Sequence, residues 1–381
     1  MRIAIITNSR IPSLTANSIQ AMKVSQALAQ LGHDVRLFTS REGDTRDWDA
    51  IAAHYGLSTQ FEIEWLPMNP RLKLYDFTLY SLQAAKAFNA DIVYTWVLNS
   101  ALAALWSGIP AILEIHGEVV GGLGPWMMRR LWRSSTSKRM LVTTKPLRDA
   151  VEAVAKLKFP NGTVQIAPNG IDPAQYENLP SPADARKELG FEEKLTVGFT
   201  GHIYPGRGAD MLFELAQRIP EVNFLWVGGK PEMVAHWRKQ VEAAGVSNVN
   251  MTGFVANSVL PLYQSAADIL LMPYGRSISA SSGQDIAQVI NPMKMFDYMA
   301  AGRAIISADL PVIHEVLNEQ NAVFAEPSDV DAWERTLREL LADEPRRLAL
   351  AAQARKDVAT RTWLARAERA LDGFYKKPDR F

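Results

Sequence analysis

Two short segments of the 381-residue chain carry residue types that bind phosphate and sugar hydroxyls. The segment GHIYPGRG, residues 201–208, combines three glycines with Arg207, whose guanidinium offers a forked and permanently charged set of donors. The segment NPMKMFD, residues 291–297, places Lys294 and Asp297 three positions apart, on one face of a predicted helix. We interpret this pattern as a site for a ligand with phosphate at one end and hydroxyls at the other.

Local features of both segments favour an anion, although a structural alternative stays open for each. Asn291 is predicted to cap a helix with Pro292 in its first turn, which leaves backbone amides and a positive dipole end directed outward. The alternative is an intrahelical ion pair between Lys294 and Asp297 on a solvated face. For residues 201–208 the alternative is an ordinary connecting turn, and His202 is as consistent with a structural hydrogen bond as with a ligand contact.

Two further loops follow predicted strands in the first half of the chain. The segment LEIHGEVVGGLG, residues 113–124, offers His116 and Glu118 directly after an apolar run. The segment NSRIPSLTANS, residues 8–18, supplies hydroxyls and amides that suit a polar substrate, and a solvated surface loop is the alternative. It lacks the G-x-G-x-x-G pattern, which argues against a dinucleotide-dependent dehydrogenase.

The elements that would position these residues alternate between short apolar strands and amphipathic helices. Residues 2–7, 34–39, 91–96, 110–117, 139–144 and 163–170 are predicted strands, and the same order restarts at Leu195. This pattern predicts two doubly wound α/β domains in series. We place the first domain at residues 1–168, a linker at 169–194, the second domain at 195–356, and a C-terminal helix that returns to the first domain at 357–381.

Composition narrows the class of protein. Lys and Arg number 41, as do Asp and Glu, so the net charge gives no general attraction to nucleic acid. There is no cysteine, and the six histidines do not show a metal-ligand spacing, so no metal site is predicted. We find no secretion signal and no apolar run of membrane-spanning length, and we therefore expect a cytoplasmic protein.

Five motifs taken in order resemble the retaining nucleotide-sugar glycosyltransferases of family 4, a bacterial branch in particular. They are PNGID from residue 168, GHIYPGRGADML from residue 201, GFV from residue 253, AADILLMPY from residue 266 and PMKMFDYMAAGRAIISADLPVIHEVL from residue 292. The resemblance implies the GT-B fold, in which two Rossmann-like domains face each other across a cleft. It also implies that no cofactor or metal is required and that the donor substrate is a nucleotide diphosphate sugar.

The resemblance assigns roles to individual residues. His116, Arg207, Lys294 and Asp285 are the implied catalytic residues, with His116 in contact with the transferred sugar. Asp297 matches the ribose-binding carboxylate, which is Glu in most of the family. The remaining donor-binding residues are Gly201, His202, Gly206, Val255, Pro292 and Met293, and the implied acceptor-binding residues are Ala16, Asn17, Gln20 and Glu118.

The sequence also departs from the family pattern. Val289 stands where an acidic residue usually binds the donor sugar, and Asp285 in the same loop is the candidate substitute. His202 stands where many members have Arg, and Arg207 where Lys is usual, so fewer charges face the diphosphate. Ala16 and Asn17 replace a glycine pair, which leaves the nature of the acceptor open.

The expected reaction is transfer of a sugar to an acceptor hydroxyl with the anomeric configuration retained. The acceptor classes are a glycan, a glycolipid or a small molecule, and a lipid-linked acceptor would place the protein peripherally at the inner membrane face. For the Trp- and Arg-rich segment 125–139 we favour a domain helix with a basic face over membrane contact. A nucleotide-sugar epimerase, a phosphorylase of the same fold and a catalytically silent sugar-nucleotide binder stay open as alternatives.

Overall fold

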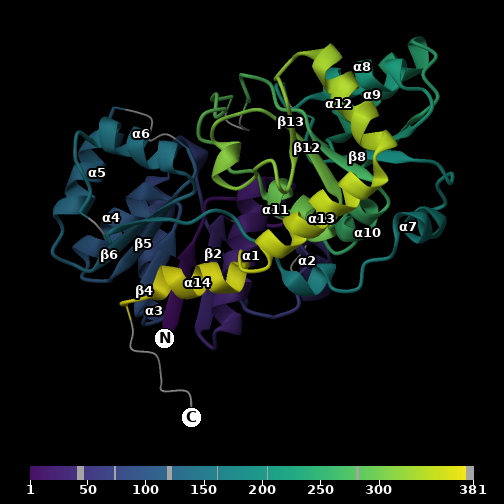
Figure 1. Ribbon diagram of the computed structural model, residues 1–381. Coiled ribbons are helices and arrows are strands. Elements are labelled where there is room, and N and C mark those ends of the chain that lie inside the picture. Colours follow the sequence, from purple (N-terminus) through teal and green to yellow (C-terminus); the bar gives the residue numbers. More distant parts are fainter. Residues whose placement is uncertain are drawn as a thin grey trace. The chain divides into compact units, whose positions relative to one another are not determined.

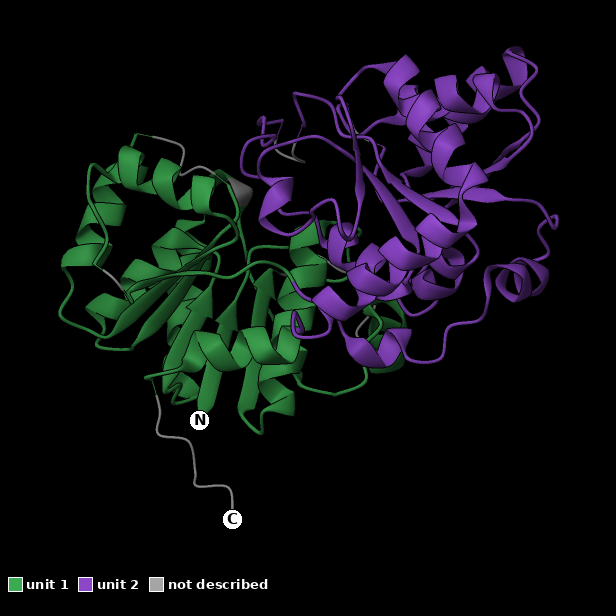
Figure 2. Ribbon diagram, viewed as in Figure 1, with its two compact units in different colours: residues 1–169, 363–381 green, residues 170–362 purple. Residues whose placement is uncertain are grey.

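The computed structural model describes residues 1–40, 47–72, 74–117, 122–160, 162–203, 205–279 and 283–374. The chain forms two compact units, coloured separately in Figure 2. Unit 1 comprises Met1–Asn169 and Trp363–Phe381, and unit 2 comprises Gly170–Thr362. Each unit is a parallel sheet with flanking helices (Figure 1), so the predicted fold class of two Rossmann-like α/β domains is confirmed.

Unit 1 is built on a seven-stranded sheet in the order β3-β2-β1-β4-β5-β6-β7, and the described pairings are parallel. Its interior strand β1 pairs with β2 and β4, and Ile3, Ala4 and Ile5 on it are completely buried. Burial on both faces explains why this strand reads as a continuous apolar run. The strands are β1 (Arg2–Ile6), β2 (Asp34–Ser40), β3 (Glu62–Leu66), β4 (Ile92–Thr95), β5 (Ala111–Ile115), β6 (Lys138–Val142) and β7 (Val164–Ile166).

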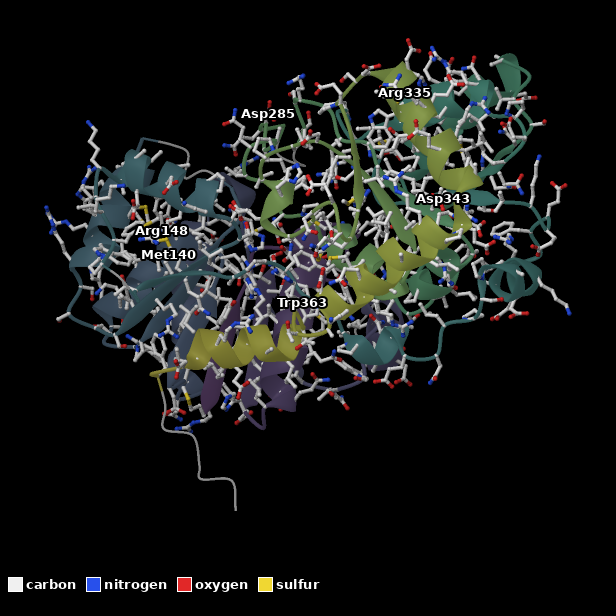
Figure 3. The ribbon with its side chains drawn as sticks, viewed as in Figure 1. Met140, Arg148, Asp285, Arg335, Asp343 and Trp363 are labelled. Atoms are coloured by element: carbon white, nitrogen blue, oxygen red, sulfur yellow. The ribbon has the colours of Figure 1, made fainter. Side chains whose placement is uncertain are left out.

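The helices of unit 1 include one from the far end of the sequence. Helix α14 (Trp363–Leu371) packs against α1 (Ala16–Gln30) and belongs to unit 1; its first residue, Trp363, is labelled in Figure 3. The other helices are α2 (Trp48–Tyr55), η1 (Pro70–Leu72), α3 (Tyr75–Ala87), α4 (Leu98–Trp106), α5 (Gly124–Arg133) and α6 (Lys145–Ala155).

Unit 2 repeats the architecture with a six-stranded parallel sheet in the order β10-β9-β8-β11-β12-β13. The strands are β8 (Thr196–Thr200), β9 (Asn223–Val227), β10 (Val249–Gly253), β11 (Ile269–Met272), β12 (Ala304–Ala308) and β13 (Val323–Ala325). The order reverses between β8 and β11, and in such sheets ligands bind beyond the strand ends at this reversal. The loops after β8 and β11 are therefore the places to look for a ligand site.

The helices of unit 2 begin inside the segment that the sequence suggested as a linker. Residues 169–194 carry η2 (Pro173–Tyr176) and α7 (Pro182–Leu189), and Ile171 and Tyr176 are buried in the core of unit 2. The other helices are α8 (Ala209–Arg218), α9 (Pro231–Ala243), α10 (Leu260–Ser265), α11 (Met293–Ala301), η3 (Ile313–Glu315), α12 (Val330–Ala342) and α13 (Glu344–Val358).

The strands missed by the sequence analysis, β3 and β13, lie at sheet edges. Strand β3 mixes charged and apolar residues and β13 has only three residues, so neither gives a strong periodic signal. Within the described residues, none of the helices combines the length and apolar character needed to cross a membrane.

Candidate active site

Helix α11 of unit 2 begins without a cap from any described side chain. The N-cap residue is Pro292, with φ −74° and ψ 131°, so the predicted cap at Asn291 is wrong by one position. Proline has no side-chain acceptor, and among the described residues no side chain caps the start of this helix with a hydrogen bond. The amides of the first turn, which includes Met293 and Lys294, are therefore available to a ligand, and the helix dipole favours an anion there. The helix ends as expected at Gly302, which adopts φ 64°.

The ammonium group of Lys294 is buried at this helix start. Its Nζ lies 3.8 Å from the centroid of the Phe199 ring and 5.6 Å from that of Tyr274. Within the described part of the chain, this nitrogen makes no hydrogen bond. Burial and the positive charge of Arg207 lower the pKa of Lys294 well below its usual value, and the charge of Asp297 opposes this shift only in part. A buried cation without a hydrogen-bond partner is suited to receive an anionic ligand.

The glycine loop after β8 lies against Lys294 and the chain that follows β11. Gly201 has φ 125°, and a Cβ there would lie 3.0 Å from the Nζ of Lys294. Gly206 has φ 77°, and a Cβ would lie 1.9 Å from the carbonyl oxygen of Ser277. The amide of Gly275 also donates to the carbonyl of Gly206 at 2.9 Å. The positive φ of Gly201 and the close backbone approach at Gly206 favour glycine at both positions, so the loop has a defined path.

Arg207 adds a second cation to this part of unit 2. Its charge lowers the pKa of Lys294 and acts on the hydroxyl of Tyr274, whose pKa is nevertheless raised because the ring is buried. Two cations that repel each other are stabilised when a diphosphate binds between them. The structure therefore brings together Gly201, Gly206, Arg207 and Lys294, four of the residues that are predicted to bind the donor. His202 lies in the same loop and is partly exposed, and Val255 packs against a small apolar cluster in unit 2.

Asp297 lies one turn beyond Lys294 and faces a tyrosine that the sequence analysis did not single out. The Asp297 carboxylate lies beside the hydroxyl of Tyr176, and burial together with this charge raises the pKa of Tyr176 well above its usual value. Tyr176 also donates to Oε1 of Gln264 at 3.2 Å. The single hydroxyl hydrogen of Tyr176 can be donated to Gln264 or to Asp297, the carboxylate that is predicted to receive the ribose hydroxyls.

Asp285, which is labelled in Figure 3, lies in the loop after β11 and stabilises that loop. Its Oδ1 accepts from the amides of Ile278 and Ala287, both at 3.0 Å. These backbone bonds lower the pKa of Asp285. The arrangement gives Asp285 a local structural role in addition to the sugar contact that we predicted. Val289, at the position of the missing acid, is buried and apolar.

Unit 1 contains a buried carboxylate that the sequence analysis missed. Glu114 on β5 pairs with Arg366 on α14, with 3.2 Å between Oε2 and Nη1 and 2.5 Å between Oε1 and Nη2. The hydroxyl of Tyr94 also donates to this carboxylate. Although burial opposes ionisation, Arg366 and His116 lower the pKa of Glu114 to about 2. The pair is thus charged in a site from which water is excluded.

Two predicted site residues meet at Glu114. Nε2 of His116 lies 2.6 Å from Oε1 of Glu114, and Nε2 of Gln20 donates to the same oxygen at 2.8 Å. Gln20 is buried and also donates to Oδ1 of Asn169 at 2.8 Å, whereas the side chain of His116 is 24% exposed.

Of the other predicted acceptor residues, Ala16 and Asn17 are exposed at the start of α1. Glu118 lies outside the described residues.

The sequence pattern does indicate that Glu114 and Arg366 are buried. Glu114 interrupts the apolar run AILEI, and Arg366 falls on the apolar stripe of WLARAERAL. A charged residue inside a buried run needs a partner. Among the described residues, no group of His, Asp and Glu forms a set that could hold a metal ion.

Two family comparisons cover most of the chain. The sequence model described as Glycosyltransferase Family 4 matches residues 18–175. The model described as Glycosyl transferases group 1 matches residues 194–343. The first match falls almost entirely in unit 1 and the second in unit 2.

Individual proteins agree with these matches. A 2-deoxystreptamine glucosyltransferase of Streptomyces kanamyceticus is 24% identical over 266 residues, which is 66% of this chain and 67% of that protein. A GDP-mannose-dependent alpha-(1-6)-phosphatidylinositol monomannoside mannosyltransferase of Mycolicibacterium smegmatis is 24% identical over 263 residues, 66% of each chain. The crystal structure of HepE from Anabaena in complex with UDP-glucose has a TM-score of 0.75 at 15% identity and covers 98% of both chains, which shows a shared fold.

Proposed function

The chain belongs to the family 4 glycosyltransferases with the GT-B fold, and on this premise we propose that it transfers a sugar from a nucleotide diphosphate sugar to an acceptor hydroxyl. The observation that carries the proposal is the buried Nζ of Lys294 at the open start of α11, with no hydrogen-bond partner among the described residues. The glycine loop and Arg207 supply further donors beside it. Together these groups suit a diphosphate.

The proposed donor site extends from the phosphates to the ribose. Lys294, Arg207 and the amides around Met293 would hold the diphosphate, and Asp297 would accept hydrogen bonds from the ribose hydroxyls. The names of relatives and structural neighbours include proteins that use GDP-mannose or bind UDP-glucose, which supports a nucleotide sugar without selecting the base. His116 is proposed to contact the transferred sugar, and Asp285 remains the candidate for a second sugar contact.

We propose that the reaction retains the anomeric configuration. The bond between the anomeric carbon and the leaving phosphate oxygen breaks, and a bond to the acceptor oxygen forms on the same face of the sugar. The acceptor proton passes to the departing phosphate, so no separate base is needed. Arg207 and Lys294 stabilise the charge that develops on the diphosphate. Stabilisation by preorganised charges is usually the largest single contribution to catalysis. We propose no metal for this step, because Arg207, Lys294 and the amides at the start of α11 are proposed to stabilise the charge of the leaving group.

The acceptor is proposed to be a hydroxyl compound that approaches the exposed start of α1, at Ala16 and Asn17. One relative is named for a lipid-linked acceptor and another for a small aminocyclitol, so both classes belong in an acceptor screen.

A thermal-shift panel of UDP-, GDP- and ADP-sugars tests the donor proposal. A donor that binds only the folded protein raises its melting temperature by mass action. We expect one nucleotide class to stabilise the wild type and to lose this effect in Arg207→Ala and Asp297→Ala. If no nucleotide sugar stabilises the wild type, the donor proposal fails.

Product analysis then separates transfer from the other chemistries of this fold. Incubation of donor alone identifies an epimerase, and NMR of the product anomeric proton distinguishes retention from inversion. A protein that binds donor but releases no nucleoside diphosphate with any acceptor would be a silent binder.

A further inference from the structure

The transfer step proposed above does not use Glu114 directly, yet four side chains donate to its carboxylate. Gln20 and His116 contact Oε1, Tyr94 contacts Oε2, and Arg366 reaches both oxygens. The side chain of Glu114 is 0% exposed and that of Arg366 is 2% exposed. A buried carboxylate with so many donors fixes the geometry of the groups around it.

The charge of Glu114 determines which nitrogen of His116 carries hydrogen. An ionised carboxylate is only an acceptor, so Nε2 of His116, 2.6 Å away, must donate. The nitrogen that remains for a ligand is Nδ1. In a neutral imidazole with hydrogen on Nε2, Nδ1 carries a lone pair and accepts a hydrogen bond from a hydroxyl.

We propose that Glu114 is a positioning residue that holds His116 in the Nε2–H tautomer, so that Nδ1 accepts a hydrogen bond from a hydroxyl of the transferred sugar. The identity of this ligand rests on the proposed function. The tautomer does not, because it follows from contacts inside unit 1.

Arg366 completes this arrangement from α14, 252 residues away in the sequence. Its charge compensates that of Glu114, and its Nε and Nη2 donate to the carbonyls of Pro168 and Ala167 at 3.0 and 3.1 Å. Without Arg366, the buried carboxylate of Glu114 would lose the cation that pairs with it and would take up a proton more readily. The final helix of the chain therefore maintains the hydrogen-bonding state of a residue that is predicted to contact substrate.

Histidine NMR reads the tautomer directly, using protein with 15N-labelled imidazoles. The chain has six histidines, and His116→Gln identifies the His116 signals by their loss. In the wild type at a pH where the ring is neutral, we expect His116 to be an Nε2–H tautomer. In Glu114→Gln the acceptor charge is gone, and we expect a mixture of tautomers.

A second variant keeps the test valid if Glu114→Gln alone leaves Arg366 unpaired and unfolds the protein. Glu114→Gln with Arg366→Met removes both charges and preserves the approximate volumes, and the same mixture is expected. Glu152→Gln is the matched control: Glu152 is also a buried carboxylate of unit 1, and it pairs with Arg148 and Lys158. It should leave the His116 signals unchanged.

Ligand titration tests the second half of the proposal. UDP-glucose, GDP-mannose and ADP-glucose are each compared with the matching nucleoside diphosphate, which lacks the sugar. We expect the donor sugar to shift the Nδ1 signal of His116, and the diphosphate alone to leave it in place. The proposal is overturned by an Nδ1–H tautomer in the wild type or an unchanged tautomer in both Glu114 variants. A nucleotide sugar that stabilises the protein without moving Nδ1 overturns the assigned sugar contact but not the donor proposal. If none of these donors stabilises the protein, the donor proposal fails while the tautomer result still stands.

Discussion

The Nζ of Lys294 lies 3.8 Å from the centre of the Phe199 ring, where the positive charge faces the aromatic π system. The aromatic face does not replace the hydrogen bonds that an ammonium makes in water. The site is thus complete only when an anion is added.

Replacing Lys294 with methionine should separate stability from donor binding. We expect Lys294→Met to unfold at the same or a higher temperature, because it removes a buried charge that makes no hydrogen bond among the described residues. Its free energy of unfolding should exceed that of the wild type by up to about 2 kcal/mol. Binding of the preferred nucleoside diphosphate should weaken by about 10- to 100-fold, since a charge-assisted hydrogen bond is lost. Thermal melts and calorimetric titration measure the two effects. Unchanged affinity in a folded variant would contradict the phosphate role.

The lowered pKa of Lys294 also predicts proton uptake on binding. In the unliganded protein the pKa is below 10.5, so between the folded value and 10.5 the unfolded chain holds more protons and stability rises with pH. A bound diphosphate favours the charged ammonium, so binding in that range should take up a proton. Calorimetry in two buffers of different ionisation enthalpy measures the uptake, and Lys294→Met is the control that should abolish it.

The ion pair of Glu114 and Arg366 predicts a dependence of the same sign at low pH, where stability also rises with pH. Because the folded pKa of Glu114 is about 2 and the unfolded value is 4.5, the pair contributes stability above 4.5 that is lost as the pH falls towards 2. The difference corresponds to about 3 kcal/mol. Urea unfolding at stepped pH should show Glu114→Gln less stable than the wild type at neutral pH, with the gap closing in acid. A gap that is constant with pH would argue against a charged pair.

The carboxylate of Asp297 is expected to accept hydrogen bonds from the hydroxyl groups of the ribose. The wild type should bind a nucleoside diphosphate more tightly than its 2′-deoxy counterpart by about 1 to 3 kcal/mol, whereas Asp297→Ala should bind both alike. Tyr176→Phe removes the hydroxyl beside Asp297 and should reduce the discrimination by less than Asp297→Ala does. Equal discrimination in the wild type and Asp297→Ala would place the ribose elsewhere.

How much of this site could be predicted from the sequence depends on how far apart the interacting residues lie along the chain. Lys294 and Asp297 share a helical face by spacing alone, and the glycine loop follows a strand that its apolar run identifies. The contact between Glu114 and Arg366 joins residues 252 positions apart, and periodicity cannot report such a pairing. The burial of Gln20 could not be predicted either, because its hydrogen-bond partners, Glu114 and Asn169, lie 94 and 149 positions away in the sequence.

The role of Asp285 can be resolved by the choice of substitution. Asparagine keeps an oxygen that can accept from the amides of Ile278 and Ala287, whereas alanine removes it. If Asp285 acts mainly on the loop, Asp285→Asn should change transfer by less than about threefold and Asp285→Ala should lower the melting temperature of the protein. A folded Asp285→Asn variant that binds donor but has lost transfer would instead establish the sugar contact.

Gly206 offers the sharpest test of the loop that is proposed to hold the diphosphate. A methyl group at this position would lie 1.9 Å from the carbonyl oxygen of Ser277, so Gly206→Ala must displace either the loop or the chain after β11. Gly190 provides the matched control, because it has a similar φ of 72° but no described atom within 4 Å of the point that a Cβ would occupy.

Both substitutions carry the strain of a left-handed alanine, about 1 kcal/mol, and only Gly206→Ala adds the clash. We therefore expect Gly190→Ala to lower stability slightly and to leave nucleotide affinity unchanged. Gly206→Ala should lower stability further and weaken nucleoside diphosphate binding at least tenfold, because the loop moves relative to Lys294. Equal affinities in the two variants would show that the diphosphate does not bind against this loop.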